Sequence, residues 1–104
     1  GEAEHAAFRA LNADVAVAAP ADDLVAAGDA LWAQRVDGAK LEQAIAKYEA
    51  ALAADANNRA ALEKVTRAWY FFGDAHTDDL NTKLARWQKA IDYGNRCLAL
   101  NTAY

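Results

Sequence analysis

Serine and methionine are absent from this chain of 104 residues, and proline and cysteine each occur once. Without serine the chain has no serine nucleophile, which excludes the serine hydrolases. The single cysteine, Cys97, excludes an intrachain disulfide and a cysteine-based zinc site. Long apolar runs are missing too, because charged residues interrupt each of them well before the roughly 18 residues that a membrane span needs. We therefore expect no membrane-spanning helix.

Alanine accounts for 29 of the residues, so the hydrophobic share of 55% contains less core-forming bulk than it suggests. This length and composition fit one domain with one modest core. The net charge is −4, and the 11 lysines and arginines are scattered along the sequence. Since phosphate contacts need basic residues clustered on one face, we expect no nucleic acid partner.

The spacing of apolar residues predicts an all-α protein of about five helices. Their expected ranges are 2–17, 22–35, 39–54, 59–72 and 80–100. Pro20 is a start signal for the second of these helices. Gly73 is expected to end the fourth, and Asp79 is expected to cap the fifth. We therefore expect a single helical domain over 1–104, with an N-terminal helix (1–20), a first antiparallel hairpin (22–56) and a second hairpin with an extended loop (59–101).

Two predicted helices have similar sequences at their C-terminal ends. Residues 44–55 align without a gap with residues 90–101, at an offset of 46. A repeated helix end is typical of a stacked helical array. Such an array offers a surface to a partner more often than a pocket for chemistry, so the self-similarity points to binding.

The same positions resemble the tetratricopeptide repeat family, whose unit has 34 residues. The matching residues in the first hairpin are Leu24, Ala27, Gly28, Leu31, Ala44, Tyr48 and Ala51, and in the second Leu62, Val65, Thr66, Trp69, Ala90, Gly94 and Cys97. Both units are longer than the family's, and neither has the closing proline. The resemblance implies a short right-handed array of stacked hairpins.

A narrower resemblance is to the periplasmic T-component family associated with TRAP transporters. It is carried by the runs 30–35 with 41–44, and 72–76 with 83–84. Members of that family are lipid-anchored helical proteins that form rings and pair with a solute-binding protein. The resemblance implies a bacterial accessory protein and favours the periplasm over the cytoplasm. The chain lacks that family's C-terminal part, which leaves coupling to a transporter open.

The chain begins with Gly1 and has no methionine, so we expect a processed piece of a longer precursor. A signal peptide on that precursor would be invisible in this sequence. A lipid anchor on it also stays open.

Signals for catalysis or for a metal are weak. His76 lies among Asp74, Asp78 and Asp79, but a calcium loop counted from Asp74 would need glutamate at the position of Ala85. A zinc site would need further histidine or cysteine ligands near His76. Cys97 falls within a helix pattern, which favours a packing residue over a nucleophile. We therefore expect no enzyme, no catalytic residue, no metal and no cofactor.

The tetratricopeptide resemblance also implies a partner-binding groove along the first helix of each hairpin. Its predicted lining residues are Val25, Asp29, Trp32, Glu63, Arg67, Tyr70 and Phe71. Such a groove suits a peptide or helix with apolar anchors and mixed charge. An alternative is that Trp32, Tyr70 and Phe71 cover the N-terminal helix instead.

The sequence thus predicts a non-catalytic domain that binds another protein or a peptide. The last helix carries Trp87, Ile91 and Leu98 with no capping helix after it, so we also expect self-association or a missing C-terminal helix. The alternative function is a helical module in which aromatic residues enclose a small apolar ligand.

Overall fold

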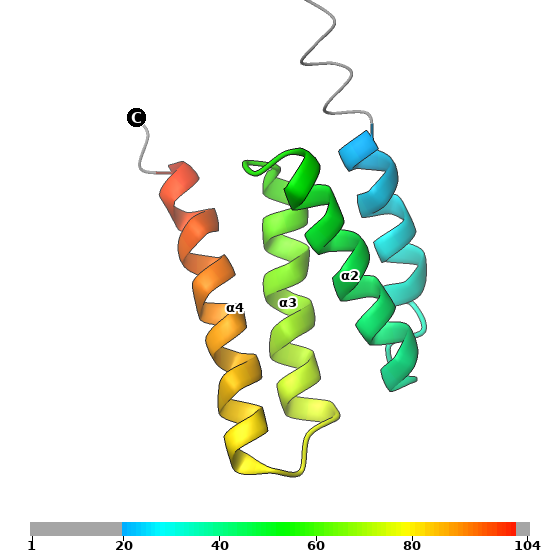
Figure 1. Cartoon of the computed structure of the whole chain (residues 1–104), viewed down its shortest axis with the longest axis vertical. Coiled ribbons are helices and arrows are strands. Elements are labelled where there is room, and N and C mark those ends of the chain that lie inside the picture. Colours follow the sequence, from blue (N-terminus) through cyan, green and yellow to red (C-terminus); the bar gives the residue numbers. More distant parts are fainter. Residues whose placement is uncertain (1–19, 102–104) are drawn as a thin grey trace, which may run out of the picture.

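The computed structural model describes residues 20–101 (Figure 1). Within this range the chain forms four helices and no strand. The helices span residues 20–32, α2 (Gly38–Ala54), α3 (Arg59–Ala75) and α4 (Leu80–Asn101). The predicted all-α class is confirmed. The helix predicted over residues 2–17 lies outside the described residues.

Side-chain caps determine where the three later helices begin. The carboxylate of Asp37 accepts a hydrogen bond from the Ala39 amide at 2.9 Å, and the Asn58 side chain accepts one from the Ala61 amide at 3.0 Å. Asp79 accepts from the Thr82 amide at 2.8 Å, as the sequence predicted. Each cap satisfies an amide that has no partner inside its helix.

The prediction that Gly73 ends its helix is wrong. The helix α3 continues to Ala75, and the loop before α4 is only 76–79. None of the described glycines has a positive φ, so Gly73 does not act as a helix terminator. It is buried against α4, where a Cβ would lie 2.8 Å from Cδ1 of Trp87. Gly73 therefore serves the close approach of two helices.

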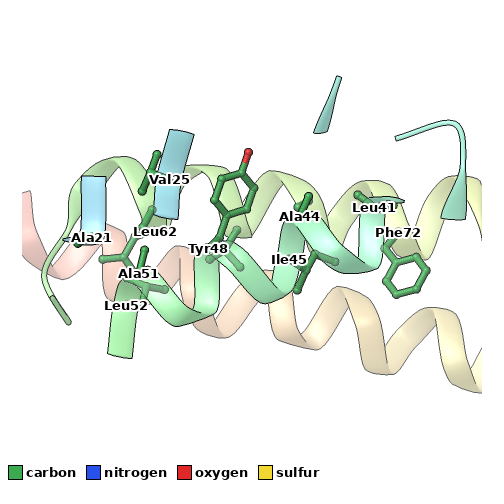
Figure 2. Packing of buried hydrophobic residues seen from close by; sticks show 13 residues of the cluster. Ala21, Val25, Leu41, Ala44, Ile45, Tyr48, Ala51, Leu52, Leu62 and Phe72 are labelled. Atoms are coloured by element: carbon green, nitrogen blue, oxygen red, sulfur yellow. The ribbon is translucent and has the colours of Figure 1, made fainter. Parts of the chain in front are cut away.

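Successive helices run antiparallel, and α3 lies between α2 and α4 (Figure 1). The buried core is formed by the first three helices and includes Leu41, Tyr48, Leu62 and Val65 as its largest enclosed side chains (Figure 2). By contrast, Ala90 is the one residue of α4 that is buried. The last helix is thus a peripheral element with much of its surface uncovered.

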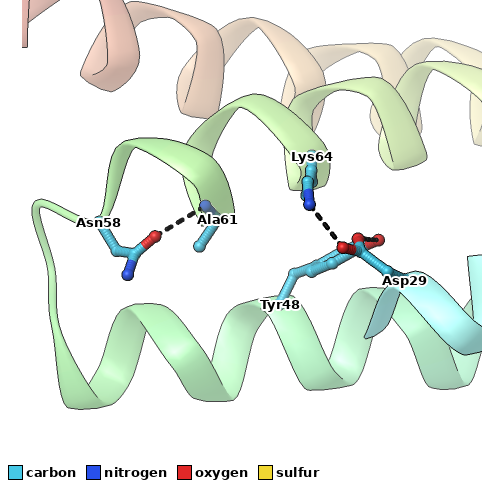
Figure 3. A network of polar contacts seen from close by, with 5 residues as sticks. All are labelled: Asp29, Tyr48, Asn58, Ala61 and Lys64. Carbon is cyan, nitrogen blue, oxygen red and sulfur yellow. Dashed lines mark hydrogen bonds and ion pairs between the residues drawn. The ribbon is translucent and has the colours of Figure 1, made fainter. Parts of the chain in front are cut away.

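A polar network ties helix 20–32 to α2 and α3 (Figure 3). The Tyr48 hydroxyl donates to Asp29 at 2.7 Å, and the Lys64 amine forms an ion pair with the same carboxylate at 2.5 Å. Burial by itself raises the pKa of Asp29, but these two hydrogen bonds and the charges of Lys64 and Arg67 outweigh it and hold the pKa below its ordinary value. Asp29 is therefore a structural junction of three helices.

Hydrogen bonds at several levels attach α4 to the rest of the molecule. The Tyr93 hydroxyl donates to Glu49 of α2 at 2.6 Å, and burial with this acidic neighbour raises the pKa of Tyr93 to about 12. At the loop end of α4, Arg86 donates to the Thr77 hydroxyl at 2.5 Å. These bonds fix the inner face of α4 to α2 and to the loop that precedes it.

Candidate binding groove

The seven residues predicted to line one groove lie in four different places. Val25 is only 7% exposed and belongs to the core, so it offers almost no surface to a partner. Asp29 is engaged with Tyr48 and Lys64. The other five residues divide between two surfaces, one at Trp32 and one along α4.

The first surface is the Trp32 cluster, formed by Trp32, Arg35, Arg67, Phe71 and His76. The rings of Trp32 and Phe71 meet edge to face, with centroids 5.5 Å apart. The guanidinium carbons of Arg67 and Arg35 lie 4.1 Å and 4.7 Å from the centroid of the Trp32 ring. The structure thus brings three predicted residues together.

Arg35 and His76 of this cluster were not predicted as site residues. His76 Nε2 is 2.8 Å from the carbonyl oxygen of Arg35, which ties the end of α3 to the turn after helix 20–32. No sequence signal in this turn distinguishes them from ordinary polar residues. The idea that Trp32 and Phe71 cover the N-terminal helix concerns residues outside the described range.

Tyr70 and Glu63 belong to the second surface, which borders α4. The Tyr70 ring stacks on Trp87 with centroids 6.0 Å apart and an interplanar angle of 17°. Tyr70 is nevertheless 59% exposed, because no residue in the described part of the chain covers the outer side of this stack. Glu63 borders the same surface about two turns away, next to Leu98.

Two neighbouring hollows between α3 and α4, of about 410 Å³ and 320 Å³, share Thr66 as a wall. We call them together the α3–α4 groove. Its lining residues are Glu63, Thr66, Tyr70, Trp87, Ala90, Ile91, Gly94, Cys97 and Leu98. Glu63 is the charged residue among them, and most of the others present carbon atoms.

An apolar ridge on α4 forms the outer border of this groove. Leu84, Ile91 and Leu98 recur at every seventh position and are 51%, 54% and 62% exposed. This spacing keeps them on one line along a helix that packs against another helix. On the open side of the ridge lie the exposed neutral residues Asn81, Gln88 and Asn95. The charged residue of this flank is Asp92, whose carboxylate accepts a hydrogen bond from Gln88 at 2.9 Å.

The groove face of α4 corresponds position by position to the buried face of α2. The buried residues of α2 are Leu41, Ala44, Ile45, Tyr48, Ala51 and Leu52. The residues 46 positions further along are Trp87, Ala90, Ile91, Gly94, Cys97 and Leu98, which are the six α4 residues that line the groove. On α2 this face is covered on both sides, by helix 20–32 and by α3. On α4, residues 20–101 cover this face on the α3 side alone.

At one pair of equivalent positions, the larger residue lies on the second helix in the first hairpin and on the first helix in the second hairpin. In the first hairpin Gly28 lies against the ring of Tyr48. The corresponding pair in the second hairpin is Thr66 and Gly94, where a Cβ on Gly94 would be 3.5 Å from Cγ2 of Thr66. The ring that fills the first hairpin has no counterpart in the second. This exchange is why the groove is hollow on both sides of Thr66.

The described part of the chain contains neither a metal-ligand cluster nor a helix able to span a membrane. Residues 20–101 contain no group of three or more His, Cys, Asp or Glu side chains placed to hold a metal ion. None of the four helices is long and apolar enough to cross a membrane. Cys97, half-buried, forms part of the groove wall.

Comparison of the chain with protein-family models, with curated proteins and with solved structures finds no match. The two family resemblances therefore rest on the residues quoted for them. What the groove can bind has to be inferred from its own geometry and chemistry.

Proposed function

We propose that this chain is a non-catalytic protein-interaction module that receives an amphipathic helix of a protein partner in the α3–α4 groove. One observation supports this most directly: the groove face of α4 has the residue spacing of the α2 face on which α3 packs. On α2 a face of this kind is a surface on which a helix packs. The groove is then an equivalent helix-binding surface that no described element of the chain occupies.

The helix α3 shows which kind of helix packs on such a surface. Its buried residues Leu62, Val65, Ala68 and Phe72 recur every three or four positions, which gives one apolar stripe. A partner helix would present the same spacing, as helices that bind in apolar grooves do. It would also carry a bulky side chain to fill the space beside Gly94, where the second hairpin lacks the ring that Tyr48 supplies in the first.

A tetratricopeptide-like array is part of this proposal, since in such an array each hairpin packs against the first helix of the next unit. The partner helix would take the place of that next helix. The bacterial, periplasmic and transporter-associated setting is a further proposal, supported by the runs 30–35, 41–44, 72–76 and 83–84.

A small apolar ligand is a second candidate occupant. The hollow lined by Thr66, Tyr70, Trp87, Ala90 and Ile91 has a volume of about 410 Å³, which is within the range of roughly 300–1,000 Å³ common for ligand pockets. A native mass spectrum of gently purified protein showing a co-purified small molecule would favour this candidate over the helix.

The helix proposal is tested with a peptide that contains α3, because α3 is the helix that packs on the equivalent face of α2. A fluorescently labelled synthetic peptide with the sequence of residues 57–77, which contains α3, is titrated with the full chain, and binding is followed by fluorescence anisotropy. We expect saturable binding with a Kd on the order of micromolar. Ile91→Glu places a charge on the ridge and should weaken binding by about tenfold or more.

Val36→Glu is the matched control. Val36 is an apolar residue that is 87% exposed and lies outside the groove, so its replacement should leave binding unchanged. A second control peptide with Leu62→Glu and Val65→Glu removes the apolar stripe and should not bind. Equal binding by the wild type and the Ile91→Glu variant would show that the peptide does not bind in the groove.

A further inference from the structure

We propose that the helix bound in the α3–α4 groove comes from a second copy of this chain, so that two α4 helices pair antiparallel about a two-fold axis at Ile91. This inference rests on the proposed function, because it assumes that the groove receives a helix. It adds the identity of the partner and the direction in which the partner lies.

The apolar ridge is self-complementary. Leu84 and Leu98 each lie seven positions from Ile91, on the same line of α4. Reversing the helix about Ile91 exchanges these two leucines and leaves the ridge unchanged. A two-fold interface requires this property. If a residue of one copy contacts a given residue of the other, the reverse contact must also form.

The charges at the two ends of the groove determine the direction. At one end the Lys83 amine lies 5.6 Å from the centroid of the Trp87 ring, and at the other end Glu63 lies beside Leu98. In an antiparallel pair, Lys83 of each copy approaches Glu63 of the other. In a parallel pair, Lys83 would face Lys83 and Glu63 would face Glu63. Charge complementarity thus favours the antiparallel arrangement.

The open flank of α4 is compatible with self-pairing. Asn81, Gln88 and Asn95, the flank residues next to the ridge, carry no charge and do not repel their copies. Asp92 lies further round the helix, where its carboxylate accepts a hydrogen bond from Gln88 at 2.9 Å. Near the axis, Gly94 has no side chain and lets the second helix approach closely. With 22 residues, α4 is about 33 Å long. A single helix pair buries less area than the extended interfaces of obligate dimers, so we expect a dimer of micromolar affinity.

Sedimentation equilibrium of the full chain, from about 1 μM to about 1 mM, measures this association. The wild type should show a monomer–dimer equilibrium. Ile91→Glu brings two like charges together at the axis and should remove the dimer over this range, whereas Val36→Glu should leave the dissociation constant unchanged. Ile91 is 54% exposed in the single chain, so circular dichroism should show the same fold in all three proteins.

A charge exchange tests the direction without changing the apolar ridge. Lys83→Glu and Glu63→Lys should each weaken the dimer by about threefold to tenfold, because each turns two attractions into two repulsions. The double variant should return the dissociation constant to the wild-type value. In a parallel pair this rescue has no physical basis.

Each other outcome overturns the inference. A dimer that survives Ile91→Glu uses another surface, and a double variant no better than the single ones rules out the antiparallel pairing. If the wild type stays monomeric up to about 1 mM but the α3 peptide binds to the groove, the second-copy inference is wrong and the proposed function stands. If neither association occurs, both are wrong.

Discussion

The ring of Tyr48 lies directly against the backbone of Gly28, so closely that a Cβ on Gly28 would be 2.5 Å from Cε1 of the ring. Tyr48 is fully buried, and its hydroxyl is fixed by Asp29 at 2.7 Å, so the ring has little room to move away. This contact sets the spacing between helix 20–32 and α2. It also distinguishes the first hairpin from the second, where Gly94 takes the position of Tyr48.

Gly28→Ala should therefore destabilise the protein. Alanine is the better helix former by about 1 kcal/mol, but forcing a methyl group into a packed contact costs about 1–3 kcal/mol. Since the Tyr48 ring is fixed, the steric effect should exceed the gain in helix propensity, and urea denaturation should show a net loss of stability. Gly94→Ala is the matched control: its Cβ would meet Thr66 at an ordinary 3.5 Å, so this variant should gain up to about 1 kcal/mol. A gain in both variants would show that the ring can move.

Tyr48→Phe should lower the free energy of unfolding by about 1 kcal/mol. The ring and its packing are kept, and the change removes only the hydroxyl that donates to Asp29. Asp29 keeps its ion pair with Lys64, so the carboxylate is not left without a partner. Tyr70→Phe serves as the control, because Tyr70 is 59% exposed and its ring stacking does not depend on the hydroxyl. Equal losses in the two variants would contradict a specific role for the Tyr48 hydroxyl.

The low pKa of Asp29 predicts a loss of stability in acid. Its pKa in the folded protein lies below the value of about 3.9 expected for the unfolded chain. The stabilisation is therefore fully present above the unfolded pKa and is lost as the pH falls through the folded pKa. Denaturation curves of the wild type and of Asp29→Asn, measured between about pH 6 and pH 2, should differ less as the pH falls. A difference that stays constant across this range would contradict the shift.

The helix pattern was predictable because its signals are local. Asp37, Asn58 and Asp79 cap helices that begin within one or two residues of the expected positions, and the apolar stripes of α2 and α3 are buried as their spacing indicates. Gly73 was misjudged because its role depends on Trp87, which is fourteen positions away and belongs to another helix. A local signal cannot show that a glycine is needed for helix packing.

The site was predicted only in part, for a related reason. The tetratricopeptide resemblance implied that Trp32, Arg67 and Phe71 share one surface, and they do meet. It could not show that Val25 would be covered by the core or that Tyr70 would turn toward Trp87. The information that locates the groove was nevertheless in the sequence, as the offset of 46 that relates α4 to α2. What was missing was which side of α4 would lack a neighbour.

Asn58→Ala should destabilise the protein by about 0.5–2 kcal/mol, since the Asn58 side chain caps α3 by accepting from the Ala61 amide. Asn57→Ala is the control, because Asn57 is an exposed turn residue that precedes the cap. Thermal unfolding followed by circular dichroism should show a lower Tm for the first variant and a nearly unchanged Tm for the second. A lower Tm for both would assign the effect to the turn as a whole.

Gly73→Ala should disturb the α3–α4 groove itself. The new Cβ would lie 2.8 Å from Cδ1 and Nε1 of Trp87 and 3.3 Å from the carbonyl oxygen of Lys83, so either the indole or the backbone of α4 must shift. Trp87 is also stacked on Tyr70 and donates to its carbonyl oxygen at 3.3 Å, so a shift of the indole breaks both contacts. We expect lower stability despite the better helix propensity of alanine, together with weaker binding of the α3 peptide. Gly94→Ala, on the same interface but with an ordinary contact, should be at least as stable as the wild type. If Gly73→Ala were equally stable and bound the peptide as well as the wild type, the close approach at Gly73 would not shape the groove.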